Sequence, residues 1–355
     1  MTDNNAQPQP TTPPSPEAIA ALWDWWNQSG AQRLDAMFTG TGDPVDVQQA
    51  VGKRVADIDP RLAWGFGPGN DSRHLFTITA GGDPELRPVA RRVIQAAPAD
   101  DEVWAITDMR QPDPSASITW AGHTIDPAEA VVETMVGTTI VGVRLYHPVF
   151  GELLDAVEPG DESEATEQAE RDVTQIGFML LQLTLGEEAL GLWLGQIIFS
   201  REVPEESIPL AELPGVVAQV ADTCPAWYGL EGESDGSPVH VTARGPLSPL
   251  VDPLLDEHIA VQLLYSHVDE QGLPTQESIT ALDELGQDMA DCLGDKGAFV
   301  AAETCDGVRL LHFYVRSDAG LVEEIRAKAD TWQQGEHEVH AAHDPAWLNI
   351  GHLRV

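Results

Sequence analysis

The residues best suited to chemistry gather in the stretch EHEVHAAHDPAW (336–347). Its histidines recur at every third position, an acidic residue follows the last of them, and a further histidine belongs to a neighbouring predicted strand. These residues are His337, His340, His343, Asp344 and His312. Imidazole nitrogens together with a carboxylate can bind zinc or nickel. The stretch therefore raises the hypothesis of a metal-dependent hydrolase or a small-ligand-binding enzyme.

The spacing of these histidines favours a different interpretation. If residues 336–342 form a strand, His337 and His340 point to opposite faces, because the side-chain period of a strand is two. Zinc-binding helices typically place their histidines four residues apart, which is not the spacing here. We therefore favour surface histidines on an edge strand, followed by an Asp-Pro turn, and we expect no metal and no cofactor.

A second candidate is the double glycine in HLFTITAGGDPELRPVARRVIQAAPADDEVWAI (74–106), where a predicted strand meets a predicted helix. A phosphate-binding loop needs backbone N–H groups at the start of a helix. Gly81-Gly82 is followed instead by Asp83, which places negative charge where a phosphate would lie. Pro88 suits the first helical position, so the helix is predicted to begin near it, beyond the glycines. The sequence predicts a structural turn.

The candidates for a nucleophile or an acid–base pair are weaker. The sequence contains no G-x-S-x-G motif, and Cys305 lies in a predicted tight turn with no base assigned beside it. Glu187 and Glu188 in LGEE (185–188) could in principle exchange protons. Adjacent glutamates at a helix end are more often a solvated terminus. We therefore predict no catalytic residue.

The charge of the chain restricts its partners. Its 355 residues include 19 basic and 58 acidic side chains, for a formal net charge of −39. Nucleic-acid affinity comes largely from Lys and Arg that displace counterions, so direct DNA or RNA binding is not expected. Such a surface suits docking onto a basic protein, adaptation to salt, or simply a solvated acidic shell.

Cysteine usage and hydropathy indicate a cytoplasmic protein. Cys224, Cys292 and Cys305 have neither paired nor metal-like spacing, which is typical of reduced thiols. The start MTDNNAQPQPTTPPSPE lacks the features of a signal peptide. No run approaches the roughly 20 apolar residues that cross a bilayer, so no membrane association is expected.

The pattern of hydrophobic residues predicts an α+β protein. We expect a disordered tail at residues 1–15, an N-terminal α+β domain at 16–222, a linker at 223–252 and a ferredoxin-like domain at 253–355. In the N-terminal domain, helices are predicted at 18–38, 45–58, near Pro88 and at 164–185, and strands at 61–66, 74–80, 102–106, 139–146 and 190–199.

The C-terminal domain has the more regular pattern. A strand at 258–267, a helix at 275–293, two strands, a second helix and the strand HEVHAA give the order β-α-β-β-α-β of a ferredoxin-like domain. Asp306-Gly307 between two strand-like runs predicts a hairpin turn. Ser317 is predicted to cap the second helix.

These motifs carry a resemblance that spans nearly the whole chain. The N-terminal run HLFTITAGGDPELRPVARRVIQAAP, the middle LQLTLGEEALGLWLGQIIF and the early WDWW resemble a family of uncharacterised bacterial proteins. The run from AVQLLYSH through GVRLLHFYV to HDPAW is similar to the ferredoxin-like domain of the regulator of ribonuclease E activity B superfamily. The resemblance implies that fold, a cytoplasmic setting and a role in binding rather than catalysis.

We therefore expect a non-enzymatic regulatory protein that presents an acidic surface to a protein partner through its C-terminal domain. The expected binding residues are His312, Asp344 and Trp347. The aromatic residues of the resemblance, Tyr314 and Trp347 above all, are first of all packing residues. The alternative remains the metal-dependent or small-ligand enzyme built on the C-terminal histidines.

Overall fold

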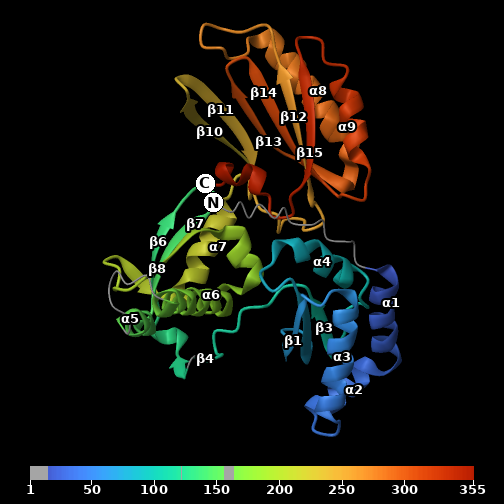
Figure 1. Cartoon of the computed structure of the whole chain (residues 1–355), viewed down its shortest axis with the longest axis vertical. Helices are drawn as coiled ribbons and strands as arrows, with labels where there is room; N and C mark the ends of the chain where they lie inside the picture. Colours follow the sequence, from blue (N-terminus) through green and yellow to red (C-terminus); the bar gives the residue numbers. More distant parts are fainter. Residues whose placement is uncertain (1–14, 121, 156–163) are drawn as a thin grey trace.

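The computed structural model describes residues 15–120, 122–155 and 164–355, which form helices and several sheets (Figure 1). The α+β class expected from the sequence is confirmed. The predicted tail lies outside the described residues except for Ser15, which caps the first helix. Within the described ranges, no helix is both long and apolar enough to span a bilayer.

The first unit joins four helices to a three-stranded sheet. Its elements are α1 (Pro16–Trp25), α2 (Ala31–Phe38), α3 (Pro44–Ile58), β1 (Ala63–Pro68), β2 (His74–Thr79), α4 (Arg87–Gln95) and β3 (Trp104–Thr107). The single helix expected over 18–38 is divided by a π-helical turn at Trp26–Gly30. The sheet order is β1-β2-β3, with β1 antiparallel to β2 and β2 parallel to β3.

The double glycine forms the turn between β2 and α4. Gly81 and Gly82 both have positive φ, which glycine adopts without strain. A short 3₁₀ turn follows, and α4 begins at Arg87 with Pro88 in its first turn. The prediction of a structural turn, with the helix starting near Pro88, is confirmed.

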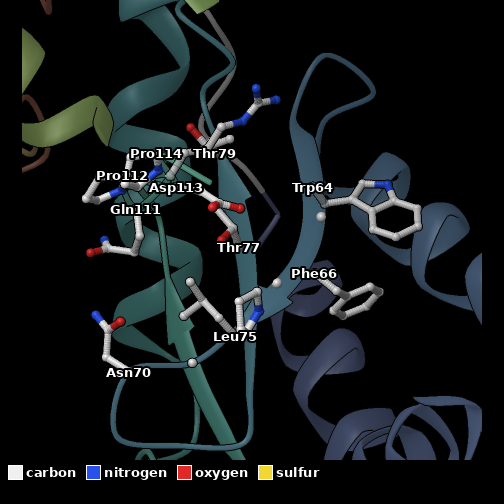
Figure 2. Close-up of a pocket in the computed structure, with 15 residues that line it drawn as sticks. Trp64, Phe66, Asn70, Leu75, Thr77, Thr79, Gln111, Pro112, Asp113 and Pro114 are labelled. Carbon is white, nitrogen blue, oxygen red and sulfur yellow. The ribbon is translucent and has the colours of Figure 1, made fainter. Parts of the chain in front are cut away.

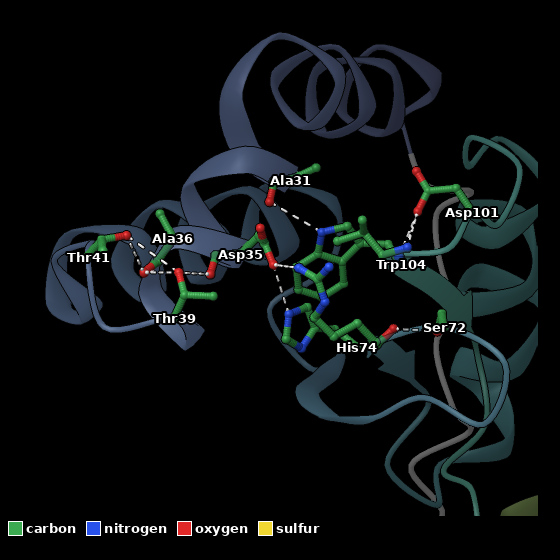
Figure 3. A network of polar contacts seen from close by, with 11 residues as sticks. Ala31, Asp35, Ala36, Thr39, Thr41, Ser72, His74, Asp101 and Trp104 are labelled. Atoms are coloured by element: carbon green, nitrogen blue, oxygen red, sulfur yellow. Dashed lines mark hydrogen bonds and ion pairs between the residues drawn. The ribbon is translucent and has the colours of Figure 1, made fainter.

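A polar network fixes the loop between β1 and β2 (Figure 3). Asp35 on α2 accepts hydrogen bonds from Arg73 at 2.9 Å and from His74 at 3.1 Å. Trp104 donates its indole N–H to the carbonyl of Ala31, and Ser72 donates its hydroxyl to the carbonyl of His74. The network ties α2, the loop and the start of β3 together.

The second unit surrounds a four-stranded sheet of order β8-β7-β6-β9. Its elements are β4 (Ile118–Trp120), β5 (His123–Ile125), β6 (Val131–Val136), β7 (Val141–Tyr146), α5 (Pro148–Asp155), α6 (Glu164–Trp193), β8 (Leu194–Ser200), β9 (Ser207–Pro209) and α7 (Leu213–Thr223). Its hydrophobic cluster is separate from that of the first unit, so the region 16–222 contains two clusters instead of one core.

Helix α6 continues past its predicted end. Gly186 has φ +75 and kinks the helix, and a further helical turn leads to Trp193. Sequence reasoning treated Gly186 as a stop signal and began the next strand at residue 190. The strand β8 begins at Leu194 instead.

The third unit is a six-stranded sheet of order β10-β11-β13-β14-β12-β15. Its elements are β10 (Trp227–Ser234), β11 (Ser237–Arg244), β12 (Glu257–Leu264), α8 (Gln276–Leu293), β13 (Gly297–Cys305), β14 (Val308–Val315), α9 (Leu321–Ala329) and β15 (His337–His343). From β12 onward the elements follow the order β-α-β-β-α-β, and every neighbouring strand pair is antiparallel.

The structure differs from the expected linker at residues 227–244, because β10 and β11 extend the C-terminal sheet. Asp235 and Gly236 both have positive φ at the turn between them, as Asp306 and Gly307 do in the predicted hairpin. Asp-Gly is the same hairpin signal in both places. It was missed at 235 because the surrounding acidic and glycine-rich residues resemble a linker.

The predicted cap of α9 is wrong. Gly320, with φ +70, precedes the first residue of that helix, Leu321. Ser317 lies outside the helix and donates both its backbone N–H and its hydroxyl to Asp256. Asp256 is a buried carboxylate, and hydrogen bonds to a charged acceptor are stronger than those between neutral groups. Ser317 therefore bonds Asp256 and does not cap the helix.

The last residues of the chain connect the third unit to the second. A 3₁₀ segment at Leu348–Leu353 packs on the sheet. Arg354 then donates to the carbonyls of Gly191 and Leu192, in the last turn of α6. A cation at this end of a helix is favoured by the helix dipole. The two units are therefore held by a charged contact as well as by packing.

Candidate functional site

The three residues expected to bind a partner lie near one another in the third unit. His312 is on β14, Asp344 follows β15, and Trp347 precedes the terminal 3₁₀ segment. They belong to, or pack against, a group of hydrogen-bonded side chains that we call the polar cluster. Its members are His258, Glu303, His312, Tyr314, Asp344 and Asn349. All three expected residues are buried, so their role in contacting a partner stays a prediction.

Asp344 organises the chain after β15. Its carboxylate accepts a hydrogen bond from the hydroxyl of Tyr314 at 2.6 Å and from the backbone N–H groups of Leu348 and Asn349. Burial, together with the bond to this carboxylate, raises the pKa of Tyr314 above its usual range. Tyr314 therefore stays a neutral donor. The Asp-Pro turn of the sequence is thus a structural acceptor site.

Trp347 closes the same face of the sheet. Its ring stacks on Tyr314 with centroids 4.2 Å apart, and its indole N–H donates to the carbonyl of Leu255 at 2.9 Å. The residue has φ +54, a left-handed conformation that is rare for a bulky side chain. Stacking and hydrogen bonding hold this strained backbone in place, which marks Trp347 as a structural anchor.

The histidines of the cluster form a buried pair. The imidazoles of His258 and His312 are 3.0 Å apart, and His312 bonds the carboxylate of Glu303 at 2.9 Å. Burial lowers the pKa of His258 to about 4, and the neighbouring His312 contributes to the same shift. The hydrogen bond from His312 lowers the pKa of Glu303. At neutral pH His258 is therefore uncharged, and Glu303, which is bonded to His312, is ionised.

The histidines of the opening motif do not converge. His337 bonds Asp330 and His340 bonds Glu338. His343 reaches across to Glu85 of the first unit at 3.0 Å. In the part of the chain that the structure describes, no group of three His, Cys, Asp or Glu side chains is arranged to hold a metal ion. The metal-dependent alternative has no assembled site in these residues.

Glu187, considered above as an acid–base candidate, is a buried link between two units. Its carboxylate accepts hydrogen bonds from the hydroxyl of Thr79 at 2.5 Å and from the backbone N–H of Arg110 at 3.0 Å. Its own N–H donates to the carbonyl of Arg110. The kink at Gly186 places it there. No local pattern in the sequence distinguishes this role from a solvated helix end.

Sequence reasoning missed a groove between α8 and β11. Helices α8 and α9 pack over β12 to β15, whereas the added hairpin extends the sheet beyond them (Figure 1). A cavity of about 250 Å³ lies where the sheet extends beyond helix α8. It is lined by Thr242, Leu282, Asp283, Gly286, Gln287, Ala290, Phe299, Ala302, Arg309 and Leu311. We call it the α8–β11 groove.

Beside the groove, β10 carries an exposed aromatic ring and two acidic residues on one face. Trp227 on β10 is 44% exposed and packs against Phe299, with ring centroids 5.5 Å apart. Glu231 and Glu233 follow on the same face of β10, because alternate residues of a strand share a face. Asp283 lines the opposite side but is paired with Arg309 at 3.0 Å.

Comparison with known proteins gives one match. Neither the curated proteins nor the solved structures contain a match to the chain. Residues 251–349 match the model of a family of unknown function (DUF695), which covers less than a third of the 355 residues. The matched region contains β12 to β15, both helices of the third unit and the Asp344–Trp347 turn, so this part of the chain is similar to a domain of unknown function.

Proposed function

We propose that the protein is a non-enzymatic binding protein that docks a basic protein partner through its C-terminal unit. The observation that carries the proposal is the α8–β11 groove. A half-exposed tryptophan over a partly buried phenylalanine is the type of anchor that dominates protein interfaces. Glu231 and Glu233 on the same face of β10 have no ion-pair partner among the described residues, and they would attract a cationic segment.

The state of the polar cluster supports binding over catalysis. Its histidines, its tyrosine and Asp344 are buried and bonded to one another, so substrate would have to displace the terminal segment to reach them. General acid–base catalysis needs such groups within hydrogen-bond reach of a substrate. The surface that we propose for binding is the α8–β11 groove together with the adjoining face of β10, which carries Trp227, Glu231 and Glu233.

The resemblance noted in the sequence agrees with this proposal. The element order β-α-β-β-α-β and the antiparallel pairing of residues 257–343 support our proposal that this unit has a ferredoxin-like fold. A regulator that acts by binding another protein, in the cytoplasm of a bacterium, is the class of protein that the resemblance implies. The partner is defined here only by its chemistry, a basic segment with apolar side chains.

The proposal is tested by capturing proteins from the lysate of the source organism with three forms of the full chain. The first is native, the second carries Trp227→Ala with Glu231→Gln and Glu233→Gln, and the third carries Glu323→Gln and Glu324→Gln on α9. We expect a partner rich in Lys and Arg that is retained by the first and third forms and lost by the second. Its retention should weaken as salt rises, since screening reduces attraction between exposed charges.

The α9 variant is the matched control, because Glu323 and Glu324 are exposed acids of the same unit on a helix that contacts β15, at the opposite edge of the sheet from β10. Equal loss of the partner from both variants would mean that bulk charge, and not the groove, attracts it. A partner retained by the groove variant would overturn the proposal. Turnover of a substrate that stops on mutation of the polar cluster would replace binding by catalysis.

A further inference from the structure

We propose that the face of the β1–β3 sheet turned away from the helices is a binding site for a small, flat organic anion. This site lies in the first unit and is independent of the α8–β11 groove, so either proposal can fail without the other. It consists of two adjoining cavities of about 450 and 510 Å³. They share Pro68, Asn70, Leu75 and Gln111, which makes them one continuous hollow.

The two faces of the sheet differ in what covers them. Trp64, Phe66 and Phe76 point to the helices and belong to their hydrophobic cluster. Leu75 and Thr77, one residue out of step, point to the hollow, and Figure 2 shows Trp64 and Phe66 directed away from it. Parallel strands such as β2 and β3 are usually covered on both faces. Here the second face carries a ligand-sized cavity.

Gly65 and Gly67 form the floor of the hollow, and neither packing nor backbone conformation requires a glycine at these two positions. Glycine weakens a strand interior and often marks a place where a ligand approaches closely. A Cβ atom added at Gly65 or Gly67 of β1 would meet no atom within 4 Å, and neither residue has positive φ. At Gly69, in contrast, an added Cβ would lie 2.1 Å from Ser72 Oγ. Gly69 is required by packing, whereas Gly65 and Gly67 leave a flat floor open to a planar group.

The first cavity contains a cation, whereas the second is lined by Asp71, Asp100 and Asp101, so the anion would lie in the first. Arg110 lines it and is exposed, and among the described residues its guanidinium has no hydrogen-bond or ion-pair partner. In a chain of net charge −39 that is unusual, since most arginines here contact a carboxylate. Asp113, which also lines the hollow, is engaged by the N–H and hydroxyl of Ser115.

Hydroxyl groups complete the recognition surface. Thr77 is 8% exposed and lines the hollow, and its hydroxyl makes no hydrogen bond to another described residue. A guanidinium and a free hydroxyl together suit a carboxylate or a phosphate. Leu75, Pro112 and Pro114 supply the apolar walls that a flat ligand body needs (Figure 2). Cavities of this volume and composition are typical of small-molecule sites.

The site is tested with 1-naphthoate, 1-naphthyl phosphate and neutral naphthalene-1-carboxamide as probes, titrated against the full chain by saturation-transfer NMR and calorimetry. We expect saturable binding of at least one anion at a single site, and binding of the amide at least 10-fold weaker. The two anions separate carboxylate from phosphate recognition. Arg110→Gln should weaken the anion about 10-fold and leave the amide unchanged.

The decisive variants are Gly65→Val and Gly67→Val, which place a side chain on the floor at positions where an added Cβ meets no atom within 4 Å. Both should abolish binding while the thermal unfolding midpoint stays the same or rises. Gly232→Val on β10, another strand glycine with open space around it, is the matched control and should bind normally. Failure of both anions to bind the native chain, equal binding of the amide, or full binding by the valine variants would each overturn the site.

Discussion

The first and third units each pack helices on one face of a sheet, and they treat the other face in opposite ways. In the third unit the terminal segment, Trp347 and the polar cluster close that face. In the first unit it carries glycines, threonines, aspartates and Arg110, which has no ion-pair partner among the described residues, around a hollow. The comparison teaches that the residues richest in chemistry serve packing here.

The largest effect should come from removing the anchor of the closed face. Trp347→Ala deletes a stacked, buried ring and should lower the free energy of unfolding by about 4 kcal/mol. Trp227→Ala, at the half-exposed ring of the α8–β11 groove, should cost about 1 kcal/mol or less. Urea unfolding of both variants measures the difference. Similar losses would mean that Trp227 is also a structural anchor.

The acceptor of the closed face should come next. Asp344→Asn turns one accepting oxygen into a donor, which leaves a donor from Tyr314, Leu348 or Asn349 without a partner. The expected loss is about 3 kcal/mol, as for other buried hydrogen bonds to a charged group. Asp330→Asn, at an exposed carboxylate on the same unit, is the control and should change stability little. Equal stabilities would remove Asp344 from the account of closure.

Acid should destabilise the folded chain through His258, which is buried on the closed face of the third unit. Because the pKa of His258 is about 4 in the folded chain and about 6.5 when unfolded, the unfolded chain takes up the proton first. Stability is complete above about pH 6.5 and falls as the pH drops towards 4, by about 2 kcal/mol between pH 7 and 4.5. His258→Gln should flatten this dependence in unfolding measurements. His340→Gln, at an exposed histidine, should keep it.

The smallest effects should distinguish the glycines of the open face. Gly69→Ala forces a Cβ into Ser72 and should destabilise the chain by about 1 kcal/mol. Gly65→Ala meets open space and should change stability by less than about 0.5 kcal/mol in either direction. Thermal unfolding of the two single variants is sufficient. A clear loss in Gly65→Ala would show that the fold itself requires that glycine.

Much of the architecture was predictable because local patterns determine it. The alternation of Ile259, Val261 and Leu263 identified a strand with one buried face, and Asp306-Gly307 identified the hairpin between β13 and β14. These features depend on periodicity and on turn chemistry over a few residues.

Other features depend on contacts between distant residues. Glu187 reads as a solvated helix end, and only the kink at Gly186 brings it to Thr79, 108 residues away in the chain. Gly65 lies in the predicted strand 61–66 and Gly67 directly follows it, but an empty space beside a strand leaves no trace in the sequence. The open face was therefore not predictable, whereas the closed face was partly so.

The buried carboxylate of Glu187 has a consequence for how such chains can diverge. It accepts from Thr79 and from the backbone of Arg110, both of which line the open face. Replacement of Thr79 by valine would remove one donor from the Glu187 carboxylate. Replacement of Glu187 by leucine would leave the Thr79 hydroxyl without its acceptor. Positions 79 and 187 should therefore covary among related sequences. Their covariation would identify the contact between the two units, which neither residue indicates by itself.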